Sequence, residues 1–374
     1  MIKIVADDRI PYLKGVLEQY GKVKYLPGIQ IENKVLRDAD ALIIRTRTKC
    51  TEQLLKETGI RFIASATIGF DHIDTHYCAT HGIKWANAPG CNSSSVQQYI
   101  AAALVKISFG SGLSLKDKTL GIIGVGNVGS KIDKLAKALG MRVLLNDPPR
   151  QRAEDQAIFA DLETTLREAD IITLHVPLNR AGEDKTYHLI DERSVKLLKK
   201  GAWLINTSRG EVTETQALKK ALDSGAIGGA VLDVWENEPD IDMEMMRKAF
   251  LATPHIAGYS ADGKANGTAM AVHALADYFN LPLTNWYPEQ IPAPRDPVIT
   301  PDGKGRTEES VIGEAILHTY DISGDDTRLR LSPGDFEKQR GDYPVRREFP
   351  AYKIRLKNTA SGVRKTLGEL GFKV

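Results

Sequence analysis

The chain has 374 residues, 42% of them hydrophobic, which is enough for two or three domains with buried cores. Its net charge is only +2 with both signs interspersed, which argues against nucleic-acid binding and against an acidic tail. No apolar run is long enough to cross a membrane, and the first residues, MIKIVADD, predict a strand rather than a signal peptide. Three cysteines without CxxC spacing are typical of free thiols, so we expect a cytoplasmic protein.

Short apolar runs alternate with amphipathic stretches in the first 90 residues. Strands are expected at IKIVAD, KVKYLP, ALIIRT, RFIASAT and IKWANAP, and helices at PYLKGVLEQYG and TEQLLKETG. This alternation predicts a parallel sheet covered on both faces. Thr46 follows ALIIR and Thr67 follows RFIASA, so both are expected at the carboxyl edge of the sheet, where ligands bind.

A histidine pair in FDHIDTHYCATHG has the spacing of metal ligands on one helix face. His72 and His76 are four residues apart, and Asp71 and Asp74 add oxygens. No second cluster supplies the remaining ligands, and solvated helix polarity explains the segment more simply. We therefore expect no metal site.

Two long helical patterns separate this region from the next. The first, SSSVQQYIAAALVKISFG, offers Ser93 to Ser95 as N-caps and Gly110 as a stop, and the second is GKANGTAMAVHALADYFN. If the chain leaves the first domain by one helix and returns by the other, that domain is discontinuous. It then comprises residues 1–92 and 260–282, with residues 93–259 inserted as a second domain and a ligand cleft between the two.

The alternation resumes at residue 119 with the runs TLGIIGV, RVLLND, DIITLHV, AWLINTS, GGAVLDV and FLATPHI. Between the first run and a helical pattern lies the motif Gly124-x-Gly126-x-x-Gly129. The first glycine permits the tight turn, the second lets the backbone approach a pyrophosphate, and the third allows helix and strand to pack closely. The pattern predicts a dinucleotide site, in which we include Asn127 and Val128 between the glycines.

An acidic residue ends the second of these runs. Asp147, eighteen residues beyond Gly129, is placed to hydrogen-bond the adenosine ribose, and its charge would repel a 2′-phosphate. The predicted cofactor is therefore NAD rather than NADP. Arg150 and Arg152 could hold a 2′-phosphate instead, although two solvated arginines are the simpler explanation.

Three later runs are each followed by a side chain suited to the oxidation of an alcohol beside a carboxylate. His255 can accept the hydroxyl proton, Glu238 can orient the imidazole, and Arg209 can grip the carboxylate with paired donors. Asp233 ends its strand where a carboxylate could accept from the nicotinamide carboxamide, or could merely cap a turn. Each residue alone has a structural explanation, but together they predict an active site.

With these residues collected, the chain resembles the D-isomer-specific 2-hydroxyacid dehydrogenases. The matching pieces are GIIGVGNVGS, LINTSRGE, VLDVWENEP and TPHIAGYS, in the order and spacing of that family. The resemblance implies an α/β fold with two doubly wound parallel-sheet domains, a flavodoxin-like substrate domain and a Rossmann NAD domain. It implies Arg209, Glu238 and His255 as the catalytic set. It also implies substrate contacts from Thr46, Thr67 and Tyr259, and NAD contacts from Asp147, Thr207, Asp233 and Gly258.

The stretch WYPEQIPAPRDPVITPDGKG reads as an irregular connector, beyond which TEESVIGEAILHTYDI predicts a helix and residues 350–374 a strand and another helix. We expect residues 286–374 to form a small C-terminal α+β domain. This unit with GDYPVRRE, together with NDPPR, APGCNS and PHIAGYSADGKANGT, resembles one member of the family. That resemblance implies a homodimer formed through this domain and a phosphorylated four-carbon 2-hydroxy acid as substrate, on the route to pyridoxal 5′-phosphate.

A phosphorylated substrate needs further donors, for which Arg45, Arg346 or Arg347 are candidates. Two other functions stay open. The chain could be another D-2-hydroxyacid dehydrogenase, of the phosphoglycerate or glycerate type. It could also be an NAD(H)-responsive binding scaffold that keeps the catalytic residues.

Overall fold

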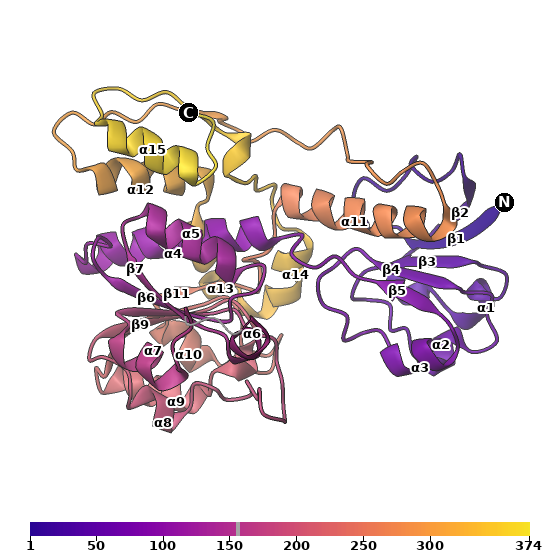
Figure 1. The fold of residues 1–374 in the computed structure, drawn as a ribbon, viewed down its shortest axis with the longest axis horizontal. Helices are drawn as coiled ribbons and strands as arrows, with labels where there is room; N and C mark the ends of the chain where they lie inside the picture. The colour runs from indigo at the N-terminus through magenta and orange to yellow at the C-terminus, as the bar shows by residue number, and fades with distance from the viewer. Residues whose placement is uncertain (155–157) are drawn as a thin grey trace. The chain divides into compact units, whose positions relative to one another are not determined.

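The computed structural model describes residues 1–154 and 158–374, and the chain forms two compact units (Figure 1). The first comprises residues 1–92 and 260–292, and the second comprises residues 93–259 and 293–374. The chain therefore leaves the first unit and returns to it. The three-domain division expected from the sequence stays a prediction, since residues 293–374 pack together with residues 93–259.

The first unit contains a parallel five-stranded sheet in the order β2-β1-β3-β4-β5. Its strands are β1 (Ile2–Asp7), β2 (Gly21–Leu26), β3 (Ala41–Ile44), β4 (Phe62–Ser65) and β5 (Lys84–Ala86). The long helix α11 (Ala261–Phe279) packs its apolar residues on one face of this sheet. The other face is covered by α1 (Asn33–Leu36), α2 (Glu52–Leu55) and α3 (Thr75–Thr80). The five predicted strands and the covering of both faces are confirmed.

The helix predicted at PYLKGVLEQYG is wrong. Residues 11–20 form a series of turns, although Leu13, Val16 and Leu17 are buried in the core as an amphipathic pattern requires. Tyr12 has φ 63° and Gly15 has φ 87°, both in the left-handed region. A right-handed helix cannot continue through these residues, so the apolar side chains reach the core from turns.

The second unit contains a parallel six-stranded sheet in the order β11-β10-β9-β8-β6-β7, which confirms the second set of predicted strands. The strands are β6 (Thr119–Ile123), β7 (Arg142–Asn146), β8 (Ile171–Leu174), β9 (Ala202–Asn206), β10 (Ile227–Leu232) and β11 (Leu251–Ala252). One face packs on α4 (Ser93–Ser111) and α5 (Gly129–Ala138). The other packs on α7 (Leu162–Glu168), α9 (Thr215–Asp223) and α10 (Met243–Lys248). Two short helices, α6 (Pro148–Glu154) and α8 (Glu192–Val195), lie in the connections.

The C-terminal residues of the second unit add four α-helices and a two-stranded parallel sheet. The elements are β12 (Val298–Ile299), α12 (Glu308–Thr319), α13 (Ile322–Leu331), α14 (Phe336–Gly341), β13 (Lys353–Ile354) and α15 (Ser361–Glu369). Helix α12 packs between α4 and α15 (Figure 1). The sequence predicted α12, β13 and α15, but it did not predict α13 or α14. It also missed β12, which lies in the stretch expected to be an irregular connector.

Buried hydrogen bonds fasten this C-terminal part to α4. Ser95 Oγ donates to Glu348 Oε1 over 2.8 Å, and Gln98 Nε2 donates to Thr319 Oγ1 over 3.0 Å. Within residues 1–154 and 158–374, no helix combines the length and apolarity that a membrane span requires.

Candidate active site

The glycine motif forms a turn between β6 and α5. Gly124 has φ 88°, and a Cβ atom there would lie 2.6 Å from the carbonyl oxygen of His175. A Cβ on Gly129 would lie 2.1 Å from the carbonyl oxygen of Gly124. A Cβ on Gly126 would meet no atom within 4 Å. Packing therefore requires the first and third glycines, whereas the second borders open space, which fits a pyrophosphate approaching the turn.

Asp147 follows β7 and is held against the glycine turn. Its carboxylate accepts hydrogen bonds from the main-chain N–H groups of Val125, over 2.8 Å, and Arg150, over 3.1 Å. This fixed position beside the turn fits a partner for the adenosine ribose. Arg150 is paired with Glu154 at 2.6 Å and Arg152 with Asp184 at 2.5 Å. These ion pairs support the structural explanation of the two arginines over a 2′-phosphate site.

The predicted acid/base pair is assembled in the structure. His255 follows β11, and its Nδ1 lies 2.7 Å from Oε2 of Glu238. The other carboxylate oxygen of Glu238 accepts the main-chain N–H of Trp235 over 2.9 Å, so both oxygens are oriented. Because a carboxylate accepts, Nδ1 of His255 is the donor, which leaves Nε2 with the lone pair of the neutral ring. The two side chains keep 31% and 20% exposure, so the imidazole is accessible to a substrate.

Asp233, at the end of β10, anchors the loop that carries His255. Its side chain is 1% exposed and accepts from Thr253 Oγ1 over 2.6 Å and from the N–H groups of Ile256 and Ala257 over 2.8 Å each. Burial raises the pKa of this carboxyl, against the opposing effects of His255 and the hydrogen bonds. This arrangement favours the turn-capping alternative for Asp233, and a contact with the carboxamide stays a prediction.

Arg209 lies in a short loop after β9 that packs against the Trp235–Glu238 segment. A Cβ on Gly210 would lie 1.9 Å from the carbonyl carbon of Trp235, so only a glycine allows the two loops to approach this closely. The Arg209 side chain is partly exposed, and its Nη1 donates to the carbonyl of Ser208 over 2.8 Å. The predicted carboxylate-binding residue is therefore held beside the segment that carries Glu238.

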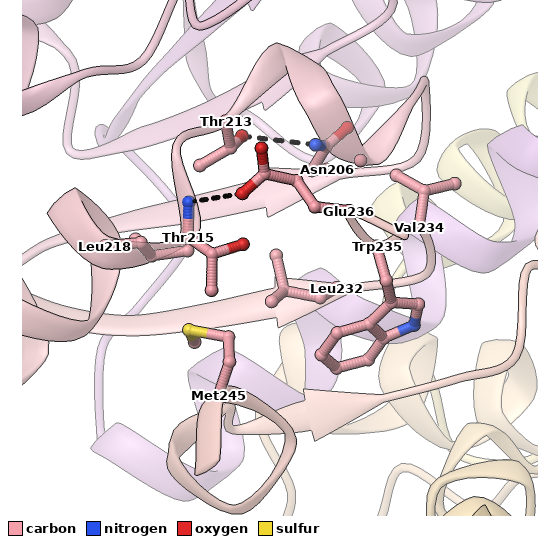
Figure 2. A pocket seen from close by; sticks show the side chains of 10 residues that line it. Asn206, Thr213, Thr215, Leu218, Leu232, Val234, Trp235, Glu236 and Met245 are labelled. Carbon is pink, nitrogen blue, oxygen red and sulfur yellow. Dashed lines mark hydrogen bonds between the residues drawn. The ribbon is translucent and has the colours of Figure 1, made fainter. Parts of the chain in front are cut away.

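A small cavity of about 10 Å³ lies beneath these loops, enough for about one water molecule (Figure 2). Glu236 at its wall accepts the N–H of Thr215 over 2.9 Å and lies 2.8 Å from Nε2 of His188 (Figure 2 shows the first contact). Glu236 thus ties the segment between Trp235 and Glu238 to the start of α9. These contacts help to hold Glu238 in place.

His175, which the sequence analysis did not single out, belongs to the same edge of the sheet. It follows β8, and its main-chain carbonyl lies against Gly124 of the glycine turn. Its Nδ1 is 3.4 Å from Oγ1 of Thr207, a predicted NAD contact. Its Nε2 lies 2.9 Å from Oγ1 of Thr173. Burial lowers the pKa of His175 to about 3, so the ring is neutral at physiological pH. Its place in DIITLHV, at a strand end like Asp147 and Thr207, was the signal available in the sequence.

In the first unit, the predicted substrate residues follow neighbouring strands. Thr46 comes two residues after β3 and is exposed, and Thr67 comes two residues after β4. Thr67 Oγ1 lies 2.8 Å from Ser65 Oγ, which lies 3.3 Å from Nε2 of His72. Arg45 pairs with the buried Asp7 at 3.2 Å. Within the part of the chain that the structure describes, no cluster of three or more His, Cys, Asp or Glu side chains could hold a metal.

Burial argues against Arg346, one of the three candidates for a contact with the substrate phosphate. Its side chain is buried, and its Nη2 donates to main-chain carbonyls, over 2.6 Å to that of Ala257 and 3.4 Å to that of Ile256. Tyr259, the predicted substrate contact, packs its ring edge-on against Tyr343 with centroids 5.8 Å apart. The carbonyl of Arg347 accepts from Gln98 Nε2 over 2.8 Å.

Comparison with known proteins identifies the group to which the chain belongs. Residues 95–257 match the family model described as D-isomer specific 2-hydroxyacid dehydrogenase, NAD binding domain. The chain is 50% identical over 94% of its length to an erythronate-4-phosphate dehydrogenase of Bacteroides fragilis, covering 99% of that protein. It belongs to the D-isomer-specific 2-hydroxyacid dehydrogenases. The domain that carries the glycine turn, Asp147 and His255 is thus the NAD-binding domain of this family.

Further relatives agree with this assignment. An erythronate-4-phosphate dehydrogenase of Proteus mirabilis is 40% identical, with 99% of each chain covered. D-lactate dehydrogenase of Aquifex aeolicus, solved with NAD and lactic acid, is 27% identical with a TM-score of 0.60, covering 74% of this chain and 95% of that one. NAD⁺-bound 3-phosphoglycerate dehydrogenase of Entamoeba histolytica is 25% identical with a TM-score of 0.63, covering 78% and 99%. Residues 293–371 match a domain of unknown function, DUF3410.

Proposed function

We propose that this chain oxidises 4-phospho-D-erythronate to (R)-3-hydroxy-2-oxo-4-phosphooxybutanoate with NAD, in the biosynthesis of pyridoxal 5′-phosphate. The contact between His255 and Glu238 beside the NAD-binding turn carries the proposal for the chemistry. The substrate assignment is supported by relatives of 40–50% identity along nearly the whole chain that are named erythronate-4-phosphate dehydrogenase.

His255 is the proposed proton acceptor. Its Nδ1 donates to Glu238, so Nε2 presents a lone pair that can take the proton of the substrate 2-hydroxyl. The carboxylate of Glu238 stabilises the imidazolium that forms and keeps the ring oriented. Asp233 holds the loop from below through the N–H groups of Ile256 and Ala257.

Arg209 is the proposed clamp for the substrate carboxylate. A guanidinium can donate two parallel hydrogen bonds to a carboxylate and also polarise the oxygen at C2 as it becomes a carbonyl. NAD, when bound, supplies the acceptor for the hydride that leaves C2. We assign its pyrophosphate to the turn of Gly124, Gly126, Asn127, Val128 and Gly129, and its ribose to Asp147. Thr207, Asp233 and Gly258 complete the proposed NAD contacts.

Thr46, Thr67 and Tyr259 are the proposed substrate contacts. Thr46 and Thr67 offer hydroxyl groups at the carboxyl edge of the first sheet. Arg45, beside Thr46, is a candidate for a cationic contact with the phosphate, and its pairing with Asp7 would orient it. Arg347 in the second unit stays a candidate as well.

We further propose that the protein is a cytoplasmic homodimer formed through the C-terminal part of the chain. Two large apolar side chains there, Leu331 and Val345, are 78% and 61% exposed. Such exposure is consistent with a surface that a second copy covers.

A panel of substrates tests the proposed function. Formation of NADH or NADPH is followed with 4-phosphoerythronate, 3-phosphoglycerate and glycerate, each with NAD or NADP. We expect the highest kcat/KM for 4-phosphoerythronate with NAD. Equal or faster turnover of 3-phosphoglycerate or glycerate would instead identify another dehydrogenase of the family. NADH binding without turnover of any acid would point to a binding scaffold.

A further inference from the structure

Arg346 is a buried cation in contact with the loop that carries His255. It lies in an irregular segment between α14 and the C-terminal β13, and its side chain is 5% exposed. Its guanidinium carbon is 4.4 Å from the centroid of the Tyr320 ring and 5.8 Å from that of Tyr343. The mechanism proposed above gives no role to the C-terminal part of the chain that supplies this arginine.

The hydrogen bonds of Arg346 are concentrated on one peptide segment. Its Nη2 donates to the carbonyls of Ala257 and Ile256, whose N–H groups donate to Asp233. Arg346 therefore holds the carbonyls of residues 256–257, and Asp233, directly after β10, holds their amides. His255, directly before this segment, has φ 56°, in the left-handed region that residues other than glycine seldom occupy.

The remaining donors of Arg346 show that it is poorly suited to a purely stabilising role. Within the described residues, its buried Nε and Nη1 have no hydrogen-bond acceptor. A buried charge with unsatisfied donors costs free energy, and apolar replacements of such groups are often neutral or stabilising. Contacts with two aromatic faces offset part of this cost.

We propose that Arg346 is a positioning residue, through which the C-terminal part of the chain holds the His255–Tyr259 loop in the conformation needed for proton transfer. This inference rests on the proposed function of His255. Tyr343 belongs to the same arrangement, because its ring packs on Tyr259 and its hydroxyl donates to Asp325 over 2.7 Å. Arg346 acts through main-chain carbonyls of the loop and itself touches no reacting atom.

The test compares Arg346→Met with a matched arginine. Arg330 also donates to two main-chain carbonyls, those of Met246 and Ala249 over 2.8 Å each, but at the end of α10. We expect Arg346→Met to lower kcat about 10- to 100-fold, as small displacements of reacting groups do, with KM and NADH affinity nearly unchanged and Tm retained. Arg330→Met should lower Tm and leave kcat close to that of the natural protein. Arg346→Lys, which keeps the charge but places its donors on a single nitrogen, should recover part of kcat.

Amide hydrogen exchange of residues 255–258, measured on the full chain, gives a readout that needs no substrate. Faster exchange in Arg346→Met than in the natural protein and in Arg330→Met is expected. An unchanged kcat, or a loss of kcat that merely follows a loss of Tm, would overturn the proposal. If Arg346→Met does not fold, the shorter and uncharged Arg346→Gln replaces it, and unaltered loop exchange with full kcat in that variant would overturn the proposal too. Absence of turnover in the natural protein would refute the proposed function, while the exchange comparison would still decide whether Arg346 holds the loop.

Discussion

His255 shows how little a residue type reveals by itself, because a histidine at a strand end is more often structural. Its role is indicated by its neighbours, since Glu238 fixes Nδ1 and Asp233 accepts the amides that follow. We predict that His255→Asn lowers kcat by about 10² to 10⁴-fold, because an amide cannot accept the hydroxyl proton. The affinity for NADH, measured by fluorescence titration, should change little. Full turnover by this variant would exclude His255 as the proton carrier.

His175 gives a prediction for stability against pH. Its pKa in the folded protein is lowered by burial to about 3, whereas an exposed histidine titrates near 6.5. Between about pH 6.5 and pH 3, His175 is therefore protonated in the unfolded chain but neutral in the folded chain. The contribution of the neutral ring is fully present above pH 6.5 and is lost as the pH falls, by at most about 1.4 kcal/mol per unit.

Urea unfolding at pH 7, 6 and 5 measures this effect. We expect the free energy of unfolding to fall less with decreasing pH in His175→Gln than in the natural protein, because glutamine does not titrate. Parallel curves for the two proteins would contradict the assignment.

At the scale of elements, the strand–turn–helix unit of β6 and α5 separates two uses of glycine. A Cβ on Gly129 would meet the Gly124 carbonyl at 2.1 Å, so Gly129→Ala should lower the free energy of unfolding by about 1–3 kcal/mol or more. A Cβ on Gly126 meets no protein atom within 4 Å, so Gly126→Ala should keep Tm. It should instead weaken NAD binding, since the added methyl group would stand where the pyrophosphate approaches the backbone.

Calorimetric titration with NAD, alongside thermal unfolding, distinguishes these two outcomes. Each variant serves as the control for the other, because both add one methyl group to the same motif. Unchanged NAD affinity in Gly126→Ala would place the pyrophosphate away from this turn.

The elements also show what could be predicted from the sequence. All eleven strands of the two large sheets were predicted, because buried parallel strands are continuous apolar runs whose signal is local. The glycine motif and Asp147 can be singled out in the sequence because their proposed chemistry depends on fixed spacing. The helix predicted at PYLKGVLEQYG is wrong, because positive φ angles at Tyr12 and Gly15 override the amphipathic periodicity.

Contacts between distant residues were beyond the reach of the sequence. Arg346 lies 89 residues from Ala257, and Gly210 meets Trp235 across two loops, so neither contact leaves a local pattern. The sequence therefore indicates Arg346 only by its charge, as one of three candidates for the substrate phosphate. His175 was passed over because its run, DIITLHV, had already been explained as a strand.

At the scale of the whole molecule, the decisive feature is α4, which has buried residues on every side. Gln98, Tyr99, Ile100, Ala101, Ala102 and Ala103 are consecutive and all buried. A helix buried all round needs cover on two sides. The sheet of the NAD-binding domain covers one side, and α12 with its neighbours covers the other.

We therefore predict that removal of residues 293–374 does not leave an intact dehydrogenase. The core around α4 is shared with Val311, Ile316, Tyr320 and Phe349, so the truncated chain would expose a continuous apolar surface on α4. Ser95 and Gln98 would also lose their hydrogen-bond partners Glu348 and Thr319. We expect the fragment 1–292 to bind a hydrophobic dye, to unfold without a sharp thermal transition and to lose turnover. A soluble, monodisperse fragment with a cooperative transition near that of the full chain would show instead that residues 293–374 are a separable domain, as the sequence pattern had suggested.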